Sequence, residues 1–571
     1  MAKNREVAEL LYNIGELLEL KGENPFKIRA YGKAARAVEN LNADIEETYL
    51  RKELQTVPGI GAAIAKKIEE YLRTGRLEYY EELSSEIPRG LKELLKVPGI
   101  GPKTIQVVHQ KVGITDMDSL EDAAKSGKLR ELPGFGETKE ENIIKAIERY
   151  RKRSGRIPLG KAYTIVDEIS HYLQSYLATG KLVPAGSIRR GKDTVGDIDL
   201  LAIHDHPSSL IDAFVSMPSV VQVLGKGTTK ASLVTKEGVQ VDLRILEARS
   251  FGTSLQYFTG SKEHNVKLRN LAQQKGYKLS EYGLEDVSSG DKIYCFEEEE
   301  VYHRLGLQYI PPEIRENAGE IEAASQGSVP DLLSLQDLRG DLHVHTNWSD
   351  GRNSLEDMTE AAKDRGYSYL GITDHSKSLG IAKRLSEERL LRQIGEIHRL
   401  NEKLDGFEVL AGIEVDIRAD ATLDFPDRVL EICDFVVAAV HSAQQQDERT
   451  MTARIIKAME SPHVDILAHP SGRLLGEREP YLVDMEAVLE AARRTGTILE
   501  INAFPSRLDL IDLYVRRAKD MGIRITIGTD AHSCEQLDLM KFGVTVARRG
   551  WLEKKDVVNA LPVDKLPFKR S

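Results

Sequence analysis

The sequence predicts a multidomain protein with an all-α N-terminal region, an α+β middle region and a C-terminal barrel of about seven strands. At 571 residues the chain is too long for one hydrophobic core. Helical periodicity dominates residues 1–155, whereas strand and helix patterns alternate from residue 156 onward. After residue 337, apolar runs alternate with helical segments and predict a distorted (β/α)7 barrel whose strands end near residues 345, 373, 413, 440, 468, 502 and 529.

The composition is that of a soluble globular protein, with 30% charged and 41% hydrophobic residues. No apolar run reaches the roughly 18 residues that span a bilayer, and the N-terminus has no signal-peptide core. The three cysteines lie far apart in the sequence, which suits a reducing compartment. We therefore expect a cytoplasmic protein without a membrane partner, and take a monomer as the default.

The net charge of -11 does not by itself exclude nucleic acid as a partner, because it is unevenly distributed. Residues 1–317 hold 46 Lys and Arg against 47 Asp and Glu, a net charge of -1. Residues 318–571 carry the remaining -10. Divalent cations bound in the second half would offset part of that excess.

A Pro-Gly-x-Gly pattern recurs three times in the helical region, within residues 57–61, 97–101 and 132–136. Each copy lies between two helical segments, as in a helix–hairpin–helix motif. Glycine allows the tight turn and close backbone approach to a phosphate, and the next helix offers free N–H groups. One copy could equally be an ordinary packing turn, but three favour a grip on the DNA backbone. The candidate DNA-binding glycines are Gly59, Gly61, Gly99, Gly101, Gly134 and Gly136.

The middle region combines a Gly-Ser turn with three carboxylates. Asp197 and Asp199 alternate on one predicted strand and therefore face the same side, and Asp242 lies on a later strand. Three such carboxylates can hold two Mg²⁺ or Mn²⁺ ions about 4 Å apart for phosphoryl transfer. Upstream, Ser187 and Arg190 can contact phosphate groups.

The order Gly-Ser, Arg-Arg-Gly and Asp-x-Asp resembles the nucleotidyltransferase superfamily. The segment Tyr-Phe-Thr-Gly-Ser at 257–261 then resembles the nucleotide-selecting motif of family X DNA polymerases. This resemblance implies that Ser187, Arg190 and Gly260 contact the incoming deoxynucleoside triphosphate. It also implies that Asp197 and Asp199 hold both metals and that Asp242 holds the catalytic one. Tyr257 and Phe258 would line the sugar pocket, with Asn265 and Arg269 on the minor-groove side of the nascent base pair.

The first 85 residues resemble the small lyase-type domain of the same family. Lys67 falls at the position of the family's Schiff-base lysine, and Lys27 and Tyr31 on its phosphate-binding face. A nucleophilic lysine needs a depressed pKa, which nearby Lys66 could promote. Ala63 and Phe26 depart from the eukaryotic pattern, so a solvated, DNA-facing Lys67 is the alternative.

Metal-type ligands follow each predicted strand of the C-terminal region. They begin with Asp341, His343, His345 and Asp350, and continue with Asp374, His375, Glu414, His441, His469, Asp530 and His532. Ligands at successive strand ends converge at one mouth of a barrel. Mixed histidine and carboxylate ligation suits Zn²⁺, Mn²⁺ or Fe²⁺.

This series resembles the PHP family of phosphoesterases, which holds three metals. The resemblance implies one metal on His343, His345, Glu414 and Asp530, and a second on Asp350, His375 and His532. Glu414 would bridge to a third metal on His441 and His469.

Together the motifs resemble the bacterial and archaeal family X polymerases that carry a PHP domain. The expected domains are a lyase-like domain at 1–85, a helical DNA-binding domain at 86–155, a palm at 156–250, a thumb-like nucleotide-selecting module at 251–317, a linker at 318–336 and the PHP domain at 337–571. The resemblance implies gap-filling repair synthesis on gapped or nicked DNA near the nucleoid. It also implies a metal-dependent 3′–5′ exonuclease that acts at abasic sites or on 3′-phosphates.

Three other hypotheses stay open at this point. The barrel could be a structural or regulatory metal-binding module, or the chain could be a non-catalytic DNA scaffold. A small-molecule nucleotidyltransferase fused to a phosphatase is disfavoured by the three hairpin motifs.

Overall fold

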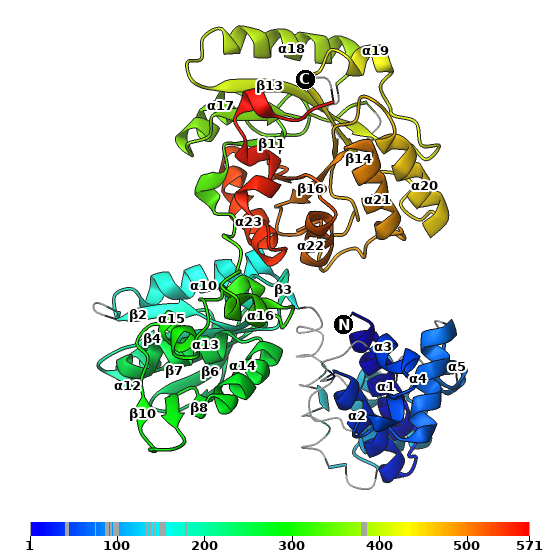
Figure 1. Ribbon diagram of the computed structural model, residues 1–571, viewed down its shortest axis with the longest axis vertical. Coiled ribbons are helices and arrows are strands. Elements are labelled where there is room, and N and C mark those ends of the chain that lie inside the picture. The colour runs from blue at the N-terminus through cyan, green and yellow to red at the C-terminus, as the bar shows by residue number, and fades with distance from the viewer. Residues whose placement is uncertain are drawn as a thin grey trace. The chain divides into compact units, whose positions relative to one another are not determined.

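Figure 1 shows the computed structural model of the chain. The structure describes residues 2–39, 41, 45–74, 76–85, 91, 94, 102–132, 135–136, 140, 143–144, 147, 156–177, 180–377 and 385–569. The chain forms two compact units, residues 1–154 and 155–571. No helix in these ranges is long and apolar enough to cross a bilayer.

The first unit is helical, as predicted. Its described helices are α1 (Ala2–Leu20), α2 (Pro25–Glu39), α3 (Ile45–Leu50), α4 (Ala62–Thr74), α5 (Glu78–Ser85), α7 (Pro102–Val112) and α8 (Met117–Lys125). Apolar side chains at helical spacing, such as Leu11, Ile14 and Leu18 of α1, are buried in one core that all these helices share. The Asp116 carboxylate begins α8 by accepting a hydrogen bond from the Ser119 N–H at 2.8 Å.

The second unit begins with a mixed five-stranded sheet, the palm, in the order β2-β4-β7-β6-β5. Its strands are β2 (Lys181–Pro184), β4 (Asp197–Ile203), β5 (Val220–Lys226), β6 (Lys230–Thr235) and β7 (Gln240–Ile245). A short ribbon pairs β1 (Ile157–Pro158) with β3 (Thr194–Val195). The helices are α10 (Leu159–Leu173), α11 (Gly186–Arg189) and α12 (Pro207–Val215). Strands β4 and β7 run parallel, which sets the positions of the predicted aspartates.

A smaller module, the thumb, follows the palm. It contains α13 (Phe251–Thr259), α14 (Lys262–Gln274), α15 (Glu298–Arg304) and the hairpins of β8 (Tyr277–Ser280), β9 (Gly283–Asp286) and β10 (Lys292–Ile293). Its core continues into α16 (Glu320–Ser325), where Ile321 and Ala324 are buried.

The segment 318–336, predicted as a linker, is therefore folded against the thumb. Buried Glu320 holds it there by accepting hydrogen bonds from the N–H groups of Asn317 (2.9 Å) and Ala318 (2.7 Å) and by pairing with His264 Nδ1 (2.7 Å). The helix is only six residues long, too short for its burial pattern to appear as a periodicity in the sequence.

The rest of the unit is the predicted barrel, with seven parallel strands in sequence order. The strands are β11 (Gly340–Val344), β12 (Tyr369–Ile372), β13 (Glu408–Asp416), β14 (Phe435–Ala439), β15 (Ile466–Leu467), β16 (Ile498–Asn502) and β17 (Ile525–Gly528). A parallel bridge between Val344 and Ala531 nearly closes the barrel. The main helices are α17 (Leu355–Asp364), α18 (Glu387–Asn401), α19 (Asp427–Leu430), α20 (Glu448–Met459), α21 (Met485–Thr495), α22 (Asp512–Asp520) and α23 (Met540–Arg549).

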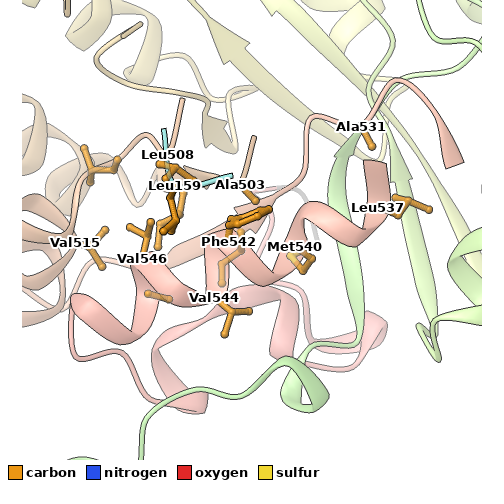
Figure 2. Close-up of a cluster of buried hydrophobic side chains, with 14 of the residues drawn as sticks. Leu159, Ala503, Leu508, Val515, Ala531, Leu537, Met540, Phe542, Val544 and Val546 are labelled. Carbon is orange, nitrogen blue, oxygen red and sulfur yellow. The ribbon is translucent and has the colours of Figure 1, made fainter. Parts of the chain in front are cut away.

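One continuous apolar core extends through the palm and the barrel. The region where the palm and the barrel pack against each other is here called the seam. Figure 2 shows Leu159 of the palm among Ala503, Leu508 and Phe542 of the barrel. The backbones come close, because a β-carbon on Gly160 would lie 2.5 Å from Pro505 Cβ. Tyr163 adds an edge-on ring contact to Phe542 at 5.7 Å.

Candidate active sites

The palm sheet places the three predicted aspartates on two neighbouring strands. Asp199 lies directly beside Asp242 in the parallel register of β4 and β7, and Asp197 lies two residues earlier on the same face. Burial, reinforced by the charges of Asp197 and Asp242, raises the pKa of Asp199 to about 6. Such crowding of carboxylates is relieved by divalent cations, so the cluster fits a metal site.

The Gly-Ser turn lies against these carboxylates. Gly186 has a φ of 58°, and a β-carbon there would lie 2.7 Å from Asp199 Oδ2. The Ala185 N–H also donates to the Asp199 carbonyl at 2.8 Å. Glycine is therefore required by both conformation and space, and the turn that carries Ser187 begins directly beside Asp199.

Arg190 and Gly260 are brought together, although 70 residues separate them. Arg190 Nη1 donates to the Thr259 carbonyl at 2.5 Å, and a β-carbon on Gly260 would lie 3.1 Å from the same nitrogen. Arg190 Nε donates to Glu316 Oε1 at 3.1 Å. The guanidinium is thus held in a fixed orientation, which suits recognition of a phosphate.

The other predicted nucleotide contacts lie on α13 and α14. The Tyr257 and Phe258 rings pack edge to face at 5.2 Å. Asn265 donates to the Tyr257 carbonyl at 2.7 Å, and Arg269 is exposed one turn further along α14. Arg244 of β7, which the sequence analysis did not select, lies 4.6 Å from the Phe258 ring and so joins this group to the aspartate-bearing strand.

In the first unit, the predicted lyase-type residues meet around Tyr79. The amines of Lys67 and Lys27 lie 4.4 and 5.7 Å from its ring centroid, and the Tyr31 ring stacks on it at 6.4 Å. Tyr79 was not identified from the sequence, because nothing in the pattern of α5 sets it apart from its neighbour Tyr80.

The first hairpin motif has the expected geometry. Gly59 has a φ of 107° and packs against the Lys33 carbonyl, and α4 begins directly after Gly61. Among the residues that the structure describes, no atom lies within 4 Å of a β-carbon placed on Gly61 or Gly136, which leaves room for a ligand backbone. Gly99, Gly101 and Gly134 lie outside the described residues.

At the barrel mouth, Glu414 of β13 is surrounded by five histidines from four different strand ends. Its Oε2 lies 3.6 Å from both His343 Nε2 and His345 Nε2, and 2.8 Å from His375 Nδ1. Its Oε1 lies 3.3 Å from both His441 Nε2 and His469 Nε2. Two ligand atoms that share a metal lie about 3.0–3.4 Å apart when each bond is about 2.1 Å. The distances from Glu414 Oε1 to His441 and His469 match that geometry, and the other three separations lie within 0.2 Å of its limits.

The remaining predicted ligands complete the same mouth. Asp530 Oδ1 lies 3.1 Å from His345 Nε2, and Asp350 lies 3.5 Å from His375 Nε2 and 3.4 Å from His532 Nε2. In the described part of the chain, three groups of ligand atoms converge within 4.8 Å. They are His345, Asp350, His375 and His532; His343, His345 and Asp530; and His375, Glu414 and His441. The palm aspartates do not converge as closely.

Several buried polar atoms at the barrel mouth lack hydrogen-bond partners within the described ranges, which indicates that these residues can hold metal ions. His343 Nε2, His345 Nε2 and Glu414 Oε2 are fully buried and have no hydrogen-bond partner among the described residues. An orphaned polar atom is costly, and a shared cation would satisfy all three. His469 and Asp530 have φ angles of 30° and 54°, a strained conformation often found at functional sites.

The histidines and carboxylates at the barrel mouth shift one another's pKa values. Burial lowers the pKa of His345 to about 3, helped by His532 and His375. Burial would raise the pKa of Glu414, but His375, His441 and His343 hold it well below its usual range. The neutral His345 ring beside the ionised Glu414 is thus already in the protonation state that metal ligation requires. Burial would lower the pKa of His375, but Glu414 and Asp350 raise it to about 9, so metal binding there would release a proton.

Several supporting residues were missed or misassigned by sequence reasoning. Glu500 accepts a hydrogen bond from His343 Nδ1 at 2.6 Å and from the His469 N–H at 2.9 Å. Asp341 and Asp374, which the strand-end pattern grouped with the ligands, instead bind protein donors: Asp341 accepts from the His343 N–H and Asp374 from the Thr346 N–H. The signal for Glu500 was an acid inside a buried strand, which needs a partner.

Four family models match consecutive parts of the chain. A helix-hairpin-helix domain matches residues 2–77, and a SAM-like helix-hairpin-helix tandem matches residues 91–149. The DNA polymerase beta thumb matches residues 254–316, and the PHP domain matches residues 341–504.

Individual relatives match the whole chain or one half of it. The DNA polymerase/3′-5′ exonuclease PolX of Bacillus subtilis is 41% identical over 97% of both chains. Rat DNA polymerase lambda is 25% identical over 55% of this chain and 56% of its own. A probable phosphatase of Caldanaerobacter subterraneus is 32% identical over 34% of this chain and 76% of its own.

Proposed function

Because the chain belongs to the family of PolX-type DNA polymerases with a C-terminal PHP domain, we propose that it fills gaps in damaged DNA and trims 3′ ends with its barrel. The observation that carries the proposal is the barrel mouth, where Glu414 lies among five histidines with orphaned ligand atoms. A module that binds no metal would not need so many strained and unsatisfied groups at one open end, and the variants below separate a catalytic metal site from a structural one.

The palm residues carry nucleotide addition. Asp197, Asp199 and Asp242 would hold two Mg²⁺ or Mn²⁺ ions, whose charge would stabilise the transition state at the phosphorus and lower the pKa of the primer hydroxyl. Asp242, oriented by Gln240 at 3.1 Å, accepts the proton of the primer 3′-hydroxyl. Ser187, Arg190 and Gly260 bind the triphosphate.

The remaining palm and thumb contacts select the nucleotide. Tyr257 and Phe258 form a rigid edge-to-face pair against which the deoxyribose packs. Asn265 and Arg269 reach the minor-groove side of the nascent pair.

The barrel residues carry hydrolysis of a phosphate ester. The nine ligands would hold up to three Zn²⁺, Mn²⁺ or Fe²⁺ ions, whose charge would lower the pKa of the attacking water and polarise the ester. Glu414 would serve as a shared ligand, and Glu500 orients the His343 ring through its Nδ1. Arg507, 3.6 Å from Asp530, adds positive charge beside the ligands.

Paired variants of the full-length protein separate the two activities. On a gapped duplex with deoxynucleotides, Asp197→Ala with Asp199→Ala abolishes extension and leaves DNA binding intact. Loss of DNA binding in parallel would mean that the palm variant is misfolded. Retained extension would show that these aspartates are not the catalytic ligands.

On the same duplex in Mn²⁺ without nucleotides, His343→Ala with His345→Ala abolishes 3′ degradation. Undiminished degradation would mean that the barrel is a structural or regulatory module.

A 3′-phosphatase activity is a second candidate, favoured by the barrel's similarity to probable phosphatases. A duplex with a 3′-phosphate at the gap tests it, because only phosphate removal allows extension by the palm. If the histidine variant extends this primer as well as the wild type, the barrel does not remove the phosphate.

The setting of these activities is also proposed. The hairpin motifs hold the DNA backbone, and the enzyme works as a monomer at the bacterial or archaeal nucleoid. Lys67 supplies an abasic-site lyase activity.

A further inference from the structure

Arg549, the last residue of α23, is a buried barrel residue that contacts the nucleotide-binding part of the palm. Its Nη1 donates to the Arg190 carbonyl at 2.8 Å, to Glu316 Oε1 at 3.1 Å and to the Glu313 carbonyl at 3.2 Å. Its Nη2 donates to Asp512 of the barrel. Only 4% of the side chain is exposed, so these contacts replace water completely.

Glu316 joins Arg549 to Arg190. The Arg190 Nε and the Arg549 Nη1 both donate to Glu316 Oε1 at 3.1 Å. Burial would raise the pKa of Glu316, but Arg549, Arg190 and Lys192 lower it below its usual value. The carboxylate therefore stays ionised and holds both arginines in place.

The palm loop also touches α23 through its backbone. Gly191 has a φ of 65°, and a β-carbon there would overlap Thr545 Cγ2. The turn that carries Ser187 and Arg190 thus ends directly on the barrel helix. Its position is set by α23 as well as by the palm sheet.

Arg190 is held in a way that leaves donors for a ligand. Its Nε bonds to Glu316 and its Nη1 to the Thr259 carbonyl, whereas its Nη2 has no hydrogen-bond partner among the described residues. Two fixed acceptors orient the planar guanidinium, so the entropy of ordering it is lost before a phosphate arrives.

We propose that Arg549 is a positioning residue for nucleotide insertion: the nuclease half braces the triphosphate-binding loop of the polymerase half. The inference rests on the proposed function, because it takes Arg190 as a triphosphate contact. Arg549 does not reach the nucleotide; it acts through the Arg190 carbonyl and Glu316. A hydrogen bond to a charged group typically changes an equilibrium about tenfold or more, so we expect about a tenfold change in nucleotide affinity.

The test compares two arginine variants with a matched control at the same seam, all in the full-length protein. Arg549→Met keeps the aliphatic bulk without donors, and Arg549→Lys keeps the charge. Glu313→Gln breaks the ion pair with Arg548 (2.7 Å) but touches neither Arg190 nor the Glu316 carboxylate. The readouts are KM and kcat for a deoxynucleotide at a one-nucleotide gap, 3′ degradation in Mn²⁺, and the melting temperature.

We expect Arg549→Met to raise the nucleotide KM about tenfold with little change in kcat, and Arg549→Lys to give an intermediate value. Glu313→Gln should leave KM unchanged, and no variant should slow 3′ degradation. An unchanged KM in Arg549→Met overturns the inference. A KM raised equally by Glu313→Gln, or degradation lost in parallel, also overturns it, since the effect would then be general loosening.

Two further variants distinguish a failure of the proposed function from a failure of the bracing inference. Arg190→Met tests the proposed function: an unchanged KM in that variant refutes the triphosphate role of Arg190, whatever Arg549 does. If Arg190→Met raises KM and Arg549→Met does not, the bracing inference alone fails. If Arg549→Met does not fold, Glu316→Met removes the shared acceptor, because methionine has no carboxylate oxygen. It should raise KM about tenfold, and an unchanged KM there refutes the brace.

Discussion

Replacing Glu500 by glutamine should weaken the barrel metal site although Glu500 is not itself a metal ligand. The carboxylate accepts at both oxygens, from His343 Nδ1 at 2.6 Å and from the His469 N–H at 2.9 Å. Glutamine has one accepting oxygen and one donating nitrogen. Whichever way the amide is turned, its NH₂ group faces a donor.

The expected loss of metal affinity follows from the two hydrogen bonds that Glu500 accepts. One charge-assisted hydrogen bond is lost, worth about 1.5–3 kcal/mol, and the other becomes a neutral one. This agrees with the roughly 10- to 100-fold loss of metal affinity typical of residues that orient metal-bound histidines. Because His343 and His469 flank Glu414 from two sides, both would lose their orientation together.

The assay is 3′ degradation as a function of Mn²⁺ concentration, with primer extension by the same preparation as the internal control. The midpoint of the Mn²⁺ curve should shift to about 10-fold or higher concentration, and extension should be unchanged. Superimposable curves for Glu500→Gln and the wild type would refute the reasoning. Loss of extension would indicate a folding defect.

The other predictions concern the palm and the lyase-type cluster. The pKa of Asp199 is raised to about 6 from 3.8, so the metal-free protein should lose stability as the pH rises from about 4 to 6. Asp199→Asn should therefore stabilise the metal-free protein at pH 7 by about 1–2 kcal/mol in thermal unfolding while abolishing extension; equal or lower stability would contradict this. Gly186→Ala should lower extension at least about 10-fold, because its β-carbon would press on Asp199 Oδ2; normal kinetics would show that the turn can move. Lys67→Ala should abolish borohydride trapping on abasic DNA and Lys66→Ala should not; trapping that persists in Lys67→Ala assigns the chemistry elsewhere.

The barrel and the convergence of its histidines and carboxylates could be predicted because each signal is local. A short apolar run followed by histidine or a carboxylate predicts both a strand and the residue at which it ends. Parallel strands then bring those ends together. The palm pair of Asp199 and Asp242 followed in the same way from alternation along two strands.

The rest depends on contacts between residues far apart in the sequence. Glu500 meets His343 across 157 positions, and Arg549 meets Arg190 across 359. No spacing rule connects such residues: the position of Glu500 inside an apolar strand indicates that it needs a partner but not which one, and Arg549 resembles an ordinary charged side chain at a helix end. The segment 318–336 was misjudged for a related reason, since its fold depends on buried Glu320 pairing with distant His264.

The continuous apolar interior at the seam limits how this chain can change over generations. Deleting the barrel would expose Leu159 and its neighbours and would leave Gly160 and Gly191 facing empty space instead of Pro505 and Thr545. A lineage that no longer needs the proposed end trimming can replace the proposed metal ligands one by one, but it must keep the barrel that carries them. A barrel without those ligands, still folded and still attached, is therefore the form in which descendants of this chain would lose the proposed activity.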